Sequence, residues 1–185
     1  RQIYPWVTTS IENQPSIESC ADMFPMTFEI KEFFRNTVFP GGHNIDHLWA
    51  NPLHQNNLRN LPPIIIATAG FDPIRDQGNE YAKCLKKAGN EVKDYCFNDL
   101  PHSFLILGRV SKTAQNANNL IGNSTLDALQ KYRDIDINQS SHRDNWTNDE
   151  VFSLLEEAIQ VASNNNAGFI IVIDEMGKVL EHSLS

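Results

Sequence analysis

The clearest pattern in the chain is a continuous apolar run over residues 64–69, where isoleucines are followed by small residues. Such runs are typical of a strand that is buried on both faces, as in a parallel sheet. After a sharp break, apolar positions recur at intervals of three and four residues, which predicts a helix that ends at Gly89. Asp72 is placed to cap this helix, and Pro73 suits its first position.

The alternation of elements continues beyond this helix. Residues 91–97 have the composition of a second strand, and residues 98–101 form a predicted loop that carries His102. A turn at 104–107 and a helix at 114–129 follow. Strands that alternate with helices across short loops indicate an α/β fold class with mostly parallel strands.

Weaker patterns flank this region. A short β-prone stretch at 3–7 precedes a loop-like segment at 10–24, and residues 26–39 show the spacing of an amphipathic helix that the Pro-Gly-Gly sequence at 40–42 ends. Towards the other end, residues 133–149 have the polar composition of a linker. We predict a helix–strand tail at 150–185, with its helix at 150–163 and a buried strand at 169–173.

The composition describes an acidic globular protein. The 185 residues are 41% hydrophobic and 21% charged, and their formal charge is −8. The hydrophobic share excludes a disordered chain, and no apolar run approaches the ~20 residues that a membrane-spanning helix needs. The negative charge, without a basic cluster, argues against nucleic acid as a partner. The three cysteines favour a reducing compartment, so we expect a cytoplasmic location.

Two residues with the chemistry of a catalytic pair stand where the two predicted strands end. Asp72 follows the first strand and His102 the second, and catalytic groups of open α/β sheets gather at the carboxyl ends of the strands. If the strands are neighbours about 5 Å apart, the two side chains can meet. A carboxylate fixes the tautomer of an imidazole and makes it a usable general base. Taken alone, however, an Asp before a Pro is more often a helix cap, and a loop His more often a surface residue.

Several segments share residues with one enzyme family. Residues 61–78 read LPPIIIATAGFDPIRDQG, residues 50–53 read ANPL, residues 81–89 read YAKCLKKAG and residues 100–104 read LPHSF. Together they closely resemble the acid-bearing segment, the stretch before it, the following helix and the histidine loop of the hormone-sensitive-lipase-like esterases, a branch of the α/β-hydrolase fold that includes acetyl esterases. The similarity runs from about residue 2 to residue 129. It implies that residues 1–132 are the C-terminal part of an α/β-hydrolase domain.

The resemblance assigns roles to particular residues. It implies that Asp72 is the acid of a Ser-His-Asp triad and that His102 is its general base. Asp76 is the competing acid, ranked second because it falls in the first turn of the helix, where a carboxylate favours the helix dipole. Residues 12–50 resemble a remnant of the family's substrate cap, so that Phe33 and Phe34 are candidate substrate-binding residues. Ser103 stands where the family usually has Gly.

The family's nucleophile is missing from the sequence. It lies in a Gly-x-Ser-x-Gly elbow upstream of the acid, and neither this motif nor a His-Gly-Gly-Gly oxyanion segment occurs in the 185 residues. The chain also begins at Arg1, without a starter Met, in a stretch that is already apolar. We therefore expect a piece of a carboxylic-ester hydrolase for small-molecule esters, inactive alone, whose partner is the missing N-terminal half of the domain.

No cofactor is expected, and no metal site. His43 and His47 are four residues apart, a spacing that on a helix face could seat a metal ion. Their region has the pattern of a loop, however, and no cysteine or glutamate completes a ligand set. Structural or solvent-facing histidines are the better interpretation.

The tail has a second resemblance. Residues 169–178 resemble the Walker B strand of a P-loop ATPase, in which Asp174 would hold Mg²⁺ through water and Glu175 would polarise the attacking water. A generic buried strand that ends in acids is the plain alternative, and the sequence has no Gly-x-x-x-x-Gly-Lys-Ser/Thr phosphate loop. The alternative function is therefore that of a non-catalytic or ATPase-derived fusion piece with a nucleotide-binding remnant.

Overall fold

A computed structural model describes residues 1–133 and 172–173 of the chain. The described residues fall into two compact units. One consists of Gln2–His102 together with Val172–Ile173, and the other of Arg1 together with residues 103–133. Each unit is described below by itself.

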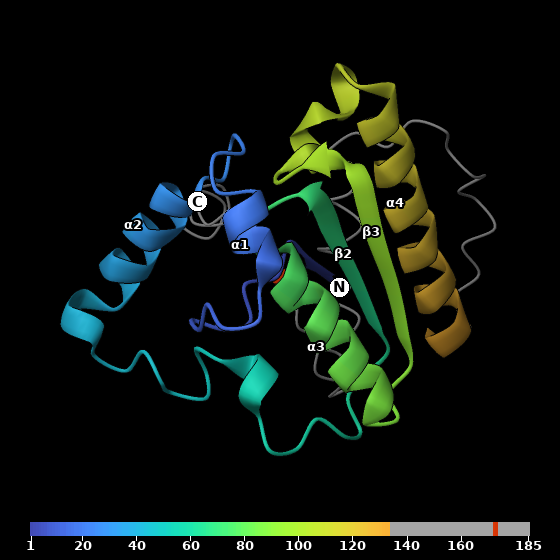
Figure 1. Ribbon diagram of the computed structural model, residues 1–185. Coiled ribbons are helices and arrows are strands. Elements are labelled where there is room, and N and C mark those ends of the chain that lie inside the picture. The colour runs from blue at the N-terminus through green and yellow to red at the C-terminus, as the bar shows by residue number, and fades with distance from the viewer. Residues whose placement is uncertain (134–171, 174–185) are drawn as a thin grey trace, which may run out of the picture. The chain divides into compact units, whose positions relative to one another are not determined.

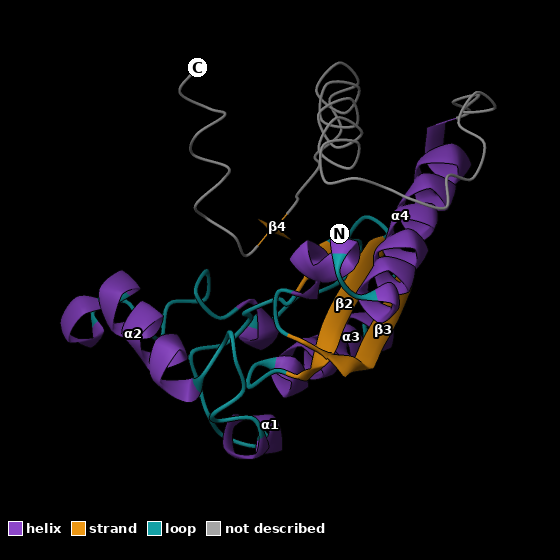
Figure 2. Ribbon diagram, turned by 90° about the horizontal axis from the view of Figure 1, so that it is seen from above, coloured by secondary structure: helices purple, strands orange, loops and turns teal. Residues whose placement is uncertain are grey.

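The first unit is built on a parallel sheet (Figures 1 and 2). Its strands are β1 (Gln2–Ile3), β2 (Ile64–Phe71), β3 (Val92–Pro101) and β4 (Val172–Ile173), and their order across the sheet is β3-β2-β1-β4. All three neighbouring pairs are parallel. The predicted α/β fold class is therefore confirmed, and so is the parallel pairing of the two main strands.

Strand β2 is buried along nearly its whole length. Residues 65–70 have buried side chains or backbone, as the continuous apolar run predicts. Its register with β3 is regular from the Ile64–Val92 pair to the Ala69–Phe97 pair and then shifts, so that Phe71 pairs with Pro101. At the shift, a Cβ on Gly70 would lie 2.1 Å from the carbonyl oxygen of Asn98. Only glycine permits this close approach of the two strands.

The prediction of a loop at residues 98–101 was wrong. Strand β3 continues to Pro101, and the irregular register beside Gly70 lets the pairing resume after a short break. A local pattern of Asn, Asp and Pro favours a loop, but pairing with a buried neighbour supplies hydrogen bonds that the pattern does not reveal. His102 therefore follows directly on a strand.

Helix α3 (Arg75–Lys87) follows β2 and packs against both β2 and β3 (Figure 1). It begins later than predicted, because the N-cap residue is Ile74 and not Asp72. The carboxylate of Asp72 accepts a hydrogen bond from the Ile74 amide (2.9 Å), and its carbonyl accepts one from the Arg75 amide (3.1 Å). These bonds form a turn between strand and helix. After the helix, Gly89 has a φ of +90°, which accounts for the predicted end.

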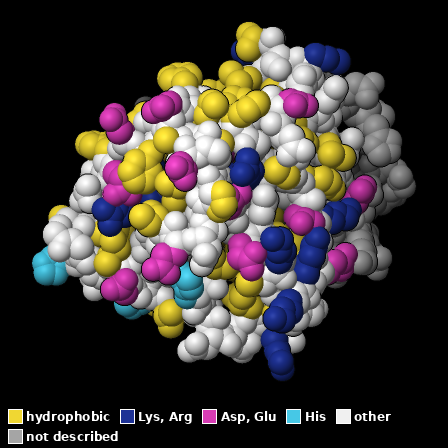
Figure 3. Space-filling view, in the orientation of Figure 1, with side chains coloured by type: hydrophobic (Ala, Val, Ile, Leu, Met, Phe, Trp, Pro, Cys, Tyr) yellow, Lys and Arg dark blue, Asp and Glu magenta, His cyan; other side chains and the backbone are white. Residues whose placement is uncertain are grey.

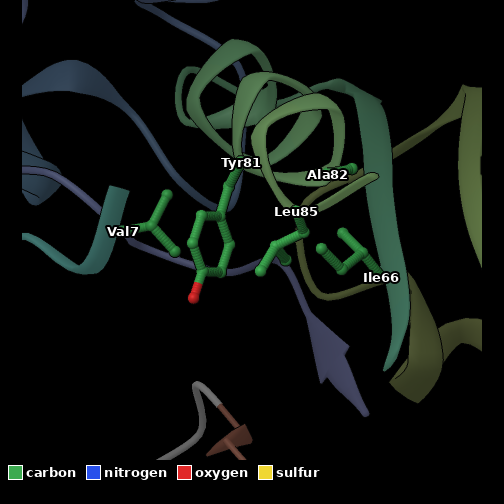
Figure 4. Close-up of a cluster of buried hydrophobic side chains, with 5 residues drawn as sticks. All are labelled: Val7, Ile66, Tyr81, Ala82 and Leu85. Carbon is green, nitrogen blue, oxygen red and sulfur yellow. The ribbon is translucent and has the colours of Figure 1, made fainter. Parts of the chain in front are cut away.

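Apolar side chains from α3, from β2 and from the segment after β1 form the core beneath this helix. Figure 4 shows five buried members of the cluster pointing toward one another: Val7, Ile66, Tyr81, Ala82 and Leu85. The spacing of four between Tyr81 and Leu85 places both on one face of α3. Gly78 lets the helix approach the sheet, since a Cβ there would lie 2.7 Å from a methyl group of Thr68.

Two helices precede the central strand. Helix α2 (Phe28–Val38) matches the amphipathic helix predicted at 26–39, and the hydroxyl of Thr27 accepts a hydrogen bond from the Ile30 amide as its cap. The short helix α1 (Pro15–Ser19) lies in a segment that was predicted to be a loop. Two 3₁₀ turns follow α2, η1 (Pro40–Gly42) and η2 (Pro52–His54).

The second unit consists of a 3₁₀ helix and a long α-helix. The 3₁₀ helix η3 (Phe104–Arg109) packs against α4 (Lys112–Arg133), and the side-chain amide of Asn118 donates to the carbonyl of Leu105 (2.9 Å). The helix predicted at 114–129 is confirmed with wider bounds. Among the helices in the described part of the chain, none has the length and apolar character needed to cross a bilayer.

Most of the predicted linker and tail lies outside the described residues. This holds for the linker at 133–149 beyond Arg133, for the helix at 150–163, and for Asp174 and Glu175. Within the tail only β4 is described, and its two residues pair with Gln2 and Ile3 of β1. The Walker B resemblance thus stays a prediction.

Candidate active site

Asp72 lies at the carboxyl end of β2, one residue beyond the strand. Its side chain is completely buried. One carboxylate oxygen, Oδ1, accepts the hydrogen bond from the Ile74 amide, and the other, Oδ2, lies 2.8 Å from Nδ1 of His102. The turn into α3 therefore holds one oxygen of the carboxylate and directs the other toward the histidine.

His102 lies at the carboxyl end of β3, directly after Pro101. Its side chain is 3% exposed, and its backbone amide donates to the carbonyl of Phe71 at the end of β2 (3.3 Å). Because β2 and β3 are neighbours, both residues lie at the same edge of the sheet. The contact that the sequence predicts between Asp72 and His102 is confirmed.

The geometry of this pair determines which imidazole nitrogen is available for chemistry. A carboxylate only accepts hydrogen bonds, so the imidazole donates from Nδ1 to Oδ2 of Asp72. In the neutral imidazole, the other nitrogen, Nε2, is then the one with a lone pair that can accept a proton. A buried carboxylate in this position also stabilises the imidazolium that forms when Nε2 takes up a proton. The arrangement is that of a general base and its orienting acid.

A third side chain contacts the pair, and the sequence patterns did not point to it. The ring of Tyr4, which is 3% exposed, packs against the imidazole of His102 with 4.7 Å between the ring centroids and a tilt of 43°. Tyr4 follows β1 directly, so three neighbouring strands each supply one residue at this edge of the sheet. The sequence showed no sign of this role, because Tyr4 lay inside the β-prone stretch at 3–7 and the end of β1 at Ile3 was not predicted.

Asp76, the competing acid, takes no part in the contact with His102. Its carboxylate accepts hydrogen bonds from the backbone amide of Ser16 (2.6 Å) and from Nε of Arg75 (2.9 Å). Burial acts to lower the pKa of Arg75, but the hydrogen bond and charge of Asp76 outweigh it, and the pKa is raised. Asp76 thus joins helix α1 to the start of α3, which is a structural task.

Phe33 and Phe34, the candidate substrate-binding residues, lie on α2. They are 64% and 44% exposed, and their rings meet edge to face at 5.8 Å. Figure 3 shows hydrophobic side chains lying among acidic and basic ones over the face that includes this helix. The buried side of α2 carries Lys31, whose ammonium lies 5.3 Å from the centre of the Trp6 ring and 3.2 Å from a carboxylate oxygen of Glu32.

The described residues supply neither a nucleophile elbow nor a metal site. The serine in the Gly-Asn-Ser sequence at 122–124 is buried within α4 and lies in a helix, not in a strand-to-helix turn. Within residues 1–133 and 172–173, no three His, Cys, Asp or Glu side chains are grouped so that they could hold a metal ion. Asp72 and His102 are therefore the chemical pair around which this site is built.

Comparison with known proteins gives one family. The family described as "alpha/beta hydrolase fold" matches residues 2–106 of the chain. Among curated proteins, the carboxylic ester hydrolase LipN of Mycobacterium tuberculosis is 43% identical over 72 residues, which are 38% of this chain and 19% of LipN. An arylesterase of Saccharolobus solfataricus is 40% identical over 62 residues, which are 34% of this chain and 20% of the arylesterase.

Solved structures give the same result. The hyperthermophilic esterase from the archaeon Pyrobaculum calidifontis superposes with a TM-score of 0.62 at 27% identity, covering 66% of this chain and 40% of the esterase. A thermostable esterase from Pseudomonas putida superposes with a TM-score of 0.58 at 28% identity, covering 63% of this chain and 37% of that enzyme. The chain thus spans well under half the length of each of these relatives.

Proposed function

This chain belongs to the alpha/beta hydrolase family, and we propose that it is part of a carboxylic-ester hydrolase in which Asp72 and His102 are the acid and the base of the catalytic triad. The observation that carries the proposal is the 2.8 Å contact between the two buried side chains at the ends of adjacent parallel strands. Relatives that are themselves ester hydrolases support the type of reaction.

The reaction proceeds through a serine ester. Nε2 of His102 accepts the proton of a serine hydroxyl as that oxygen attacks the ester carbonyl, and it then gives the proton to the departing alkoxide. Water repeats the sequence on the acyl-enzyme and releases the acid. Asp72 keeps the imidazole in the Nδ1–H tautomer throughout and stabilises its positive charge. No metal or other cofactor enters this scheme.

The serine and the oxyanion hole belong, in this proposal, to a segment that is not among these 185 residues, namely the N-terminal half of the hydrolase domain. The absence of a Gly-x-Ser-x-Gly motif from the sequence motivates this assignment. The substrate is a small-molecule ester. Phe33 and Phe34 on α2 contribute an apolar surface for it, which their exposure leaves available.

A chimera tests the assignment. The segment of the Pyrobaculum calidifontis esterase that precedes its counterpart of Gln2 is joined to this chain, and the hydrolysis of p-nitrophenyl acetate is measured. We expect serine-dependent turnover, which Asp72→Asn lowers by about 10⁴-fold and His102→Ala lowers at least as far. Asp76→Asn is the matched control and should retain activity. A folded chimera whose turnover does not respond to Asp72→Asn would contradict the proposal.

We also propose, separately, that the tail carries a nucleotide-binding remnant at Asp174 and Glu175. Its support is the Walker B resemblance of residues 169–178 alone. Magnesium-dependent binding of ATP by the chain, lost in Asp174→Asn, is the expected result. Binding that survives this substitution, or none at all, would contradict it.

We also propose a cytoplasmic location for the protein. Three free cysteines support it, of which Cys20 is buried, Cys84 half-buried and Cys96 exposed. Fractionation of cells that express the protein should recover it in the cytosolic fraction, and recovery from the culture medium would contradict the proposal.

A further inference from the structure

Tyr4 has a backbone conformation that is costly for a residue of its kind. Its φ is +50°, in the left-handed region, where bulky residues are genuine outliers. It also precedes Pro5, and a residue before proline favours φ near −120°. The left-handed conformation is unfavourable for any residue with a Cβ, because the Cβ comes too close to the following carbonyl oxygen. Such strain persists only where the surroundings impose it, and it concentrates at functional sites.

Contacts on both sides hold Tyr4 in this conformation. Its amide donates to the carbonyl of Ala67 in β2 (2.9 Å), so that the backbone stays attached to the sheet beyond the end of β1. On the other side Pro5 lies against α3, since a Cβ on Gly78 would come within 3.2 Å of its ring. Tyr4, with its positive φ, therefore lies between strand β1 and Pro5, which packs against α3.

The consequence of the strain is the position of the Tyr4 ring. It is buried and lies 4.7 Å from the imidazole of His102, centroid to centroid. The second torsion of a histidine side chain is broad, with two wells related by a half-turn of the ring. Only one of these wells presents Nδ1 to the carboxylate of Asp72. A rigid aromatic ring packed on the imidazole restricts this rotation.

From these observations we infer that Tyr4 is a positioning residue for His102: its ring confines the imidazole to the orientation in which Nδ1 donates to Asp72 and Nε2 is free. The inference rests on the proposed function, since it assigns Tyr4 to the same base. The observation that carries it is the contact between the two rings. Phenylalanine at position 4 should therefore serve as well, whereas leucine or glycine should not.

Nitrogen NMR of the histidine side chains tests the inference without any enzymatic activity. Long-range proton–nitrogen spectra of the ¹⁵N-labelled full chain distinguish a protonated Nδ1 from a protonated Nε2, at a pH where the imidazole is neutral. The chain has six histidines, and His102→Gln identifies the His102 signals. We expect a single Nδ1–H tautomer in the unsubstituted chain and in Tyr4→Phe, and loss of this single-tautomer signature in Tyr4→Leu and Tyr4→Gly.

Two of these variants separate strain from packing. Tyr4→Gly removes the ring and also the cost of a positive φ, while Tyr4→Phe keeps both. Tyr95→Leu, on β3, is the matched control for the loss of a tyrosine ring, because Tyr95 stacks on Phe97 at 6.1 Å. It should leave the His102 tautomer unchanged.

A retained Nδ1–H tautomer in Tyr4→Leu and Tyr4→Gly would overturn the inference. If neither variant folds, the unsubstituted chain decides, because nuclear Overhauser contacts between the Tyr4 and His102 rings are expected and their absence overturns the inference as well. Asp72→Asn separates this result from the proposed function. If its His102 tautomer changes while Tyr4→Leu has no effect, the Asp72–His102 pair stands and the role of Tyr4 falls.

Discussion

Ser103, directly after His102, is held in a conformation that suits glycine. Its φ is +60° and its ψ is +22°, which is the left-handed helical region. The resemblance to the esterases had identified this position as one where the family usually has Gly. The geometry supplies the reason, because a residue with a Cβ pays roughly 1–2 kcal/mol for this conformation and glycine does not.

Ser103→Gly should therefore stabilise the fold. The relief of backbone strain exceeds the extra chain entropy of glycine, which is roughly 0.5–1 kcal/mol, so we expect the free energy of unfolding to rise by about 0.5–1 kcal/mol. Chemical denaturation followed by circular dichroism measures it. Ser111→Gly is the control, since its hydroxyl accepts a hydrogen bond from the Ala114 amide and its loss should lower stability slightly. A drop in stability for Ser103→Gly would be evidence against a strained Ser103.

Local sequence was sufficient to predict the contact between Asp72 and His102, but not the packing of Tyr4 against His102. Each residue of the pair follows a predicted strand, and parallel strands end at one edge of the sheet. Tyr4 lay inside a stretch predicted to continue as a strand to Val7. The reversal of its φ depends on the packing of Pro5 and on the bond to Ala67, neither of which leaves a periodic trace in the sequence.

Helix α3 is tied to the segment after β1 by one buried side chain. Gln77 is 1% exposed, and its Oε1 accepts hydrogen bonds from the amides of Val7 (2.7 Å) and Thr8 (3.0 Å). Both donors are buried backbone groups outside any strand. A buried donor that loses its partner lowers the free energy of unfolding by about 1–3 kcal/mol. Oε1 of Gln77 therefore stabilises the contact between α3 and the segment after β1.

Gln77→Met should consequently lower the free energy of unfolding by about 2–4 kcal/mol, because methionine has a similar volume but accepts hydrogen bonds poorly. Urea denaturation provides the measurement. Lys83→Met, on the same helix with a side chain that is 72% exposed, controls for the introduction of methionine and should change stability little. Equal effects of the two substitutions would show that the Gln77 bonds contribute no net stability.

Helix α3 also places a titratable group, the phenol of Tyr81, in the hydrophobic core. Burial raises the pKa of Tyr81 above its ordinary value of 10.0. In the unfolded chain the phenol ionises near pH 10, whereas in the folded chain it stays protonated to higher pH. The unfolded state therefore binds fewer protons in this range, and stability falls as the pH rises from about 10 toward the folded pKa.

Tyr81→Phe should make the free energy of unfolding less dependent on pH above 10, and leave it little changed between pH 7 and 9. Denaturation midpoints measured across this range provide the comparison. Tyr95→Phe, which leaves Tyr81 in place, should keep the steeper decline of the unsubstituted chain. An unaltered decline in Tyr81→Phe would mean that other groups govern alkaline unfolding.

Long periodic elements were predictable, and short or irregular ones were not. Strand β2 and helices α2, α3 and α4 have patterns that span two or more turns or a whole buried strand. Helix α1 has only five residues, and it is held by distant partners, since the hydroxyl of Ser16 donates to the carbonyl of Pro73 (2.9 Å). The extension of β3 through residues 98–101 likewise depends on the close approach at Gly70. Contacts between residues far apart in the chain determine whether such elements form, and a single sequence does not reveal those contacts.

Viewed as a whole, the molecule combines a complete acid–base pair with a sequence that has no nucleophile elbow. The sheet order β3-β2-β1-β4 places Asp72, His102 and Tyr4 at the ends of three adjacent strands. The fold and the pair are thus available for the ester hydrolysis that we propose. The hydroxyl that attacks the ester and the amides that stabilise the oxyanion are not identified in residues 1–133 or 172–173.

The 185-residue chain, assayed alone, should therefore hydrolyse p-nitrophenyl acetate no faster than buffer with a matched concentration of imidazole. Removing the serine of a triad costs about 10⁶-fold in rate, nearly as much as removing the whole triad. The remaining pair gains nothing from an oxyanion hole, because the His-Gly-Gly-Gly segment is also absent from the sequence. His102→Ala is the decisive control. Hydrolysis by the unsubstituted chain above background, abolished by His102→Ala, would require a nucleophile within these residues, and Ser103 and Ser124 would then be the first serines to substitute.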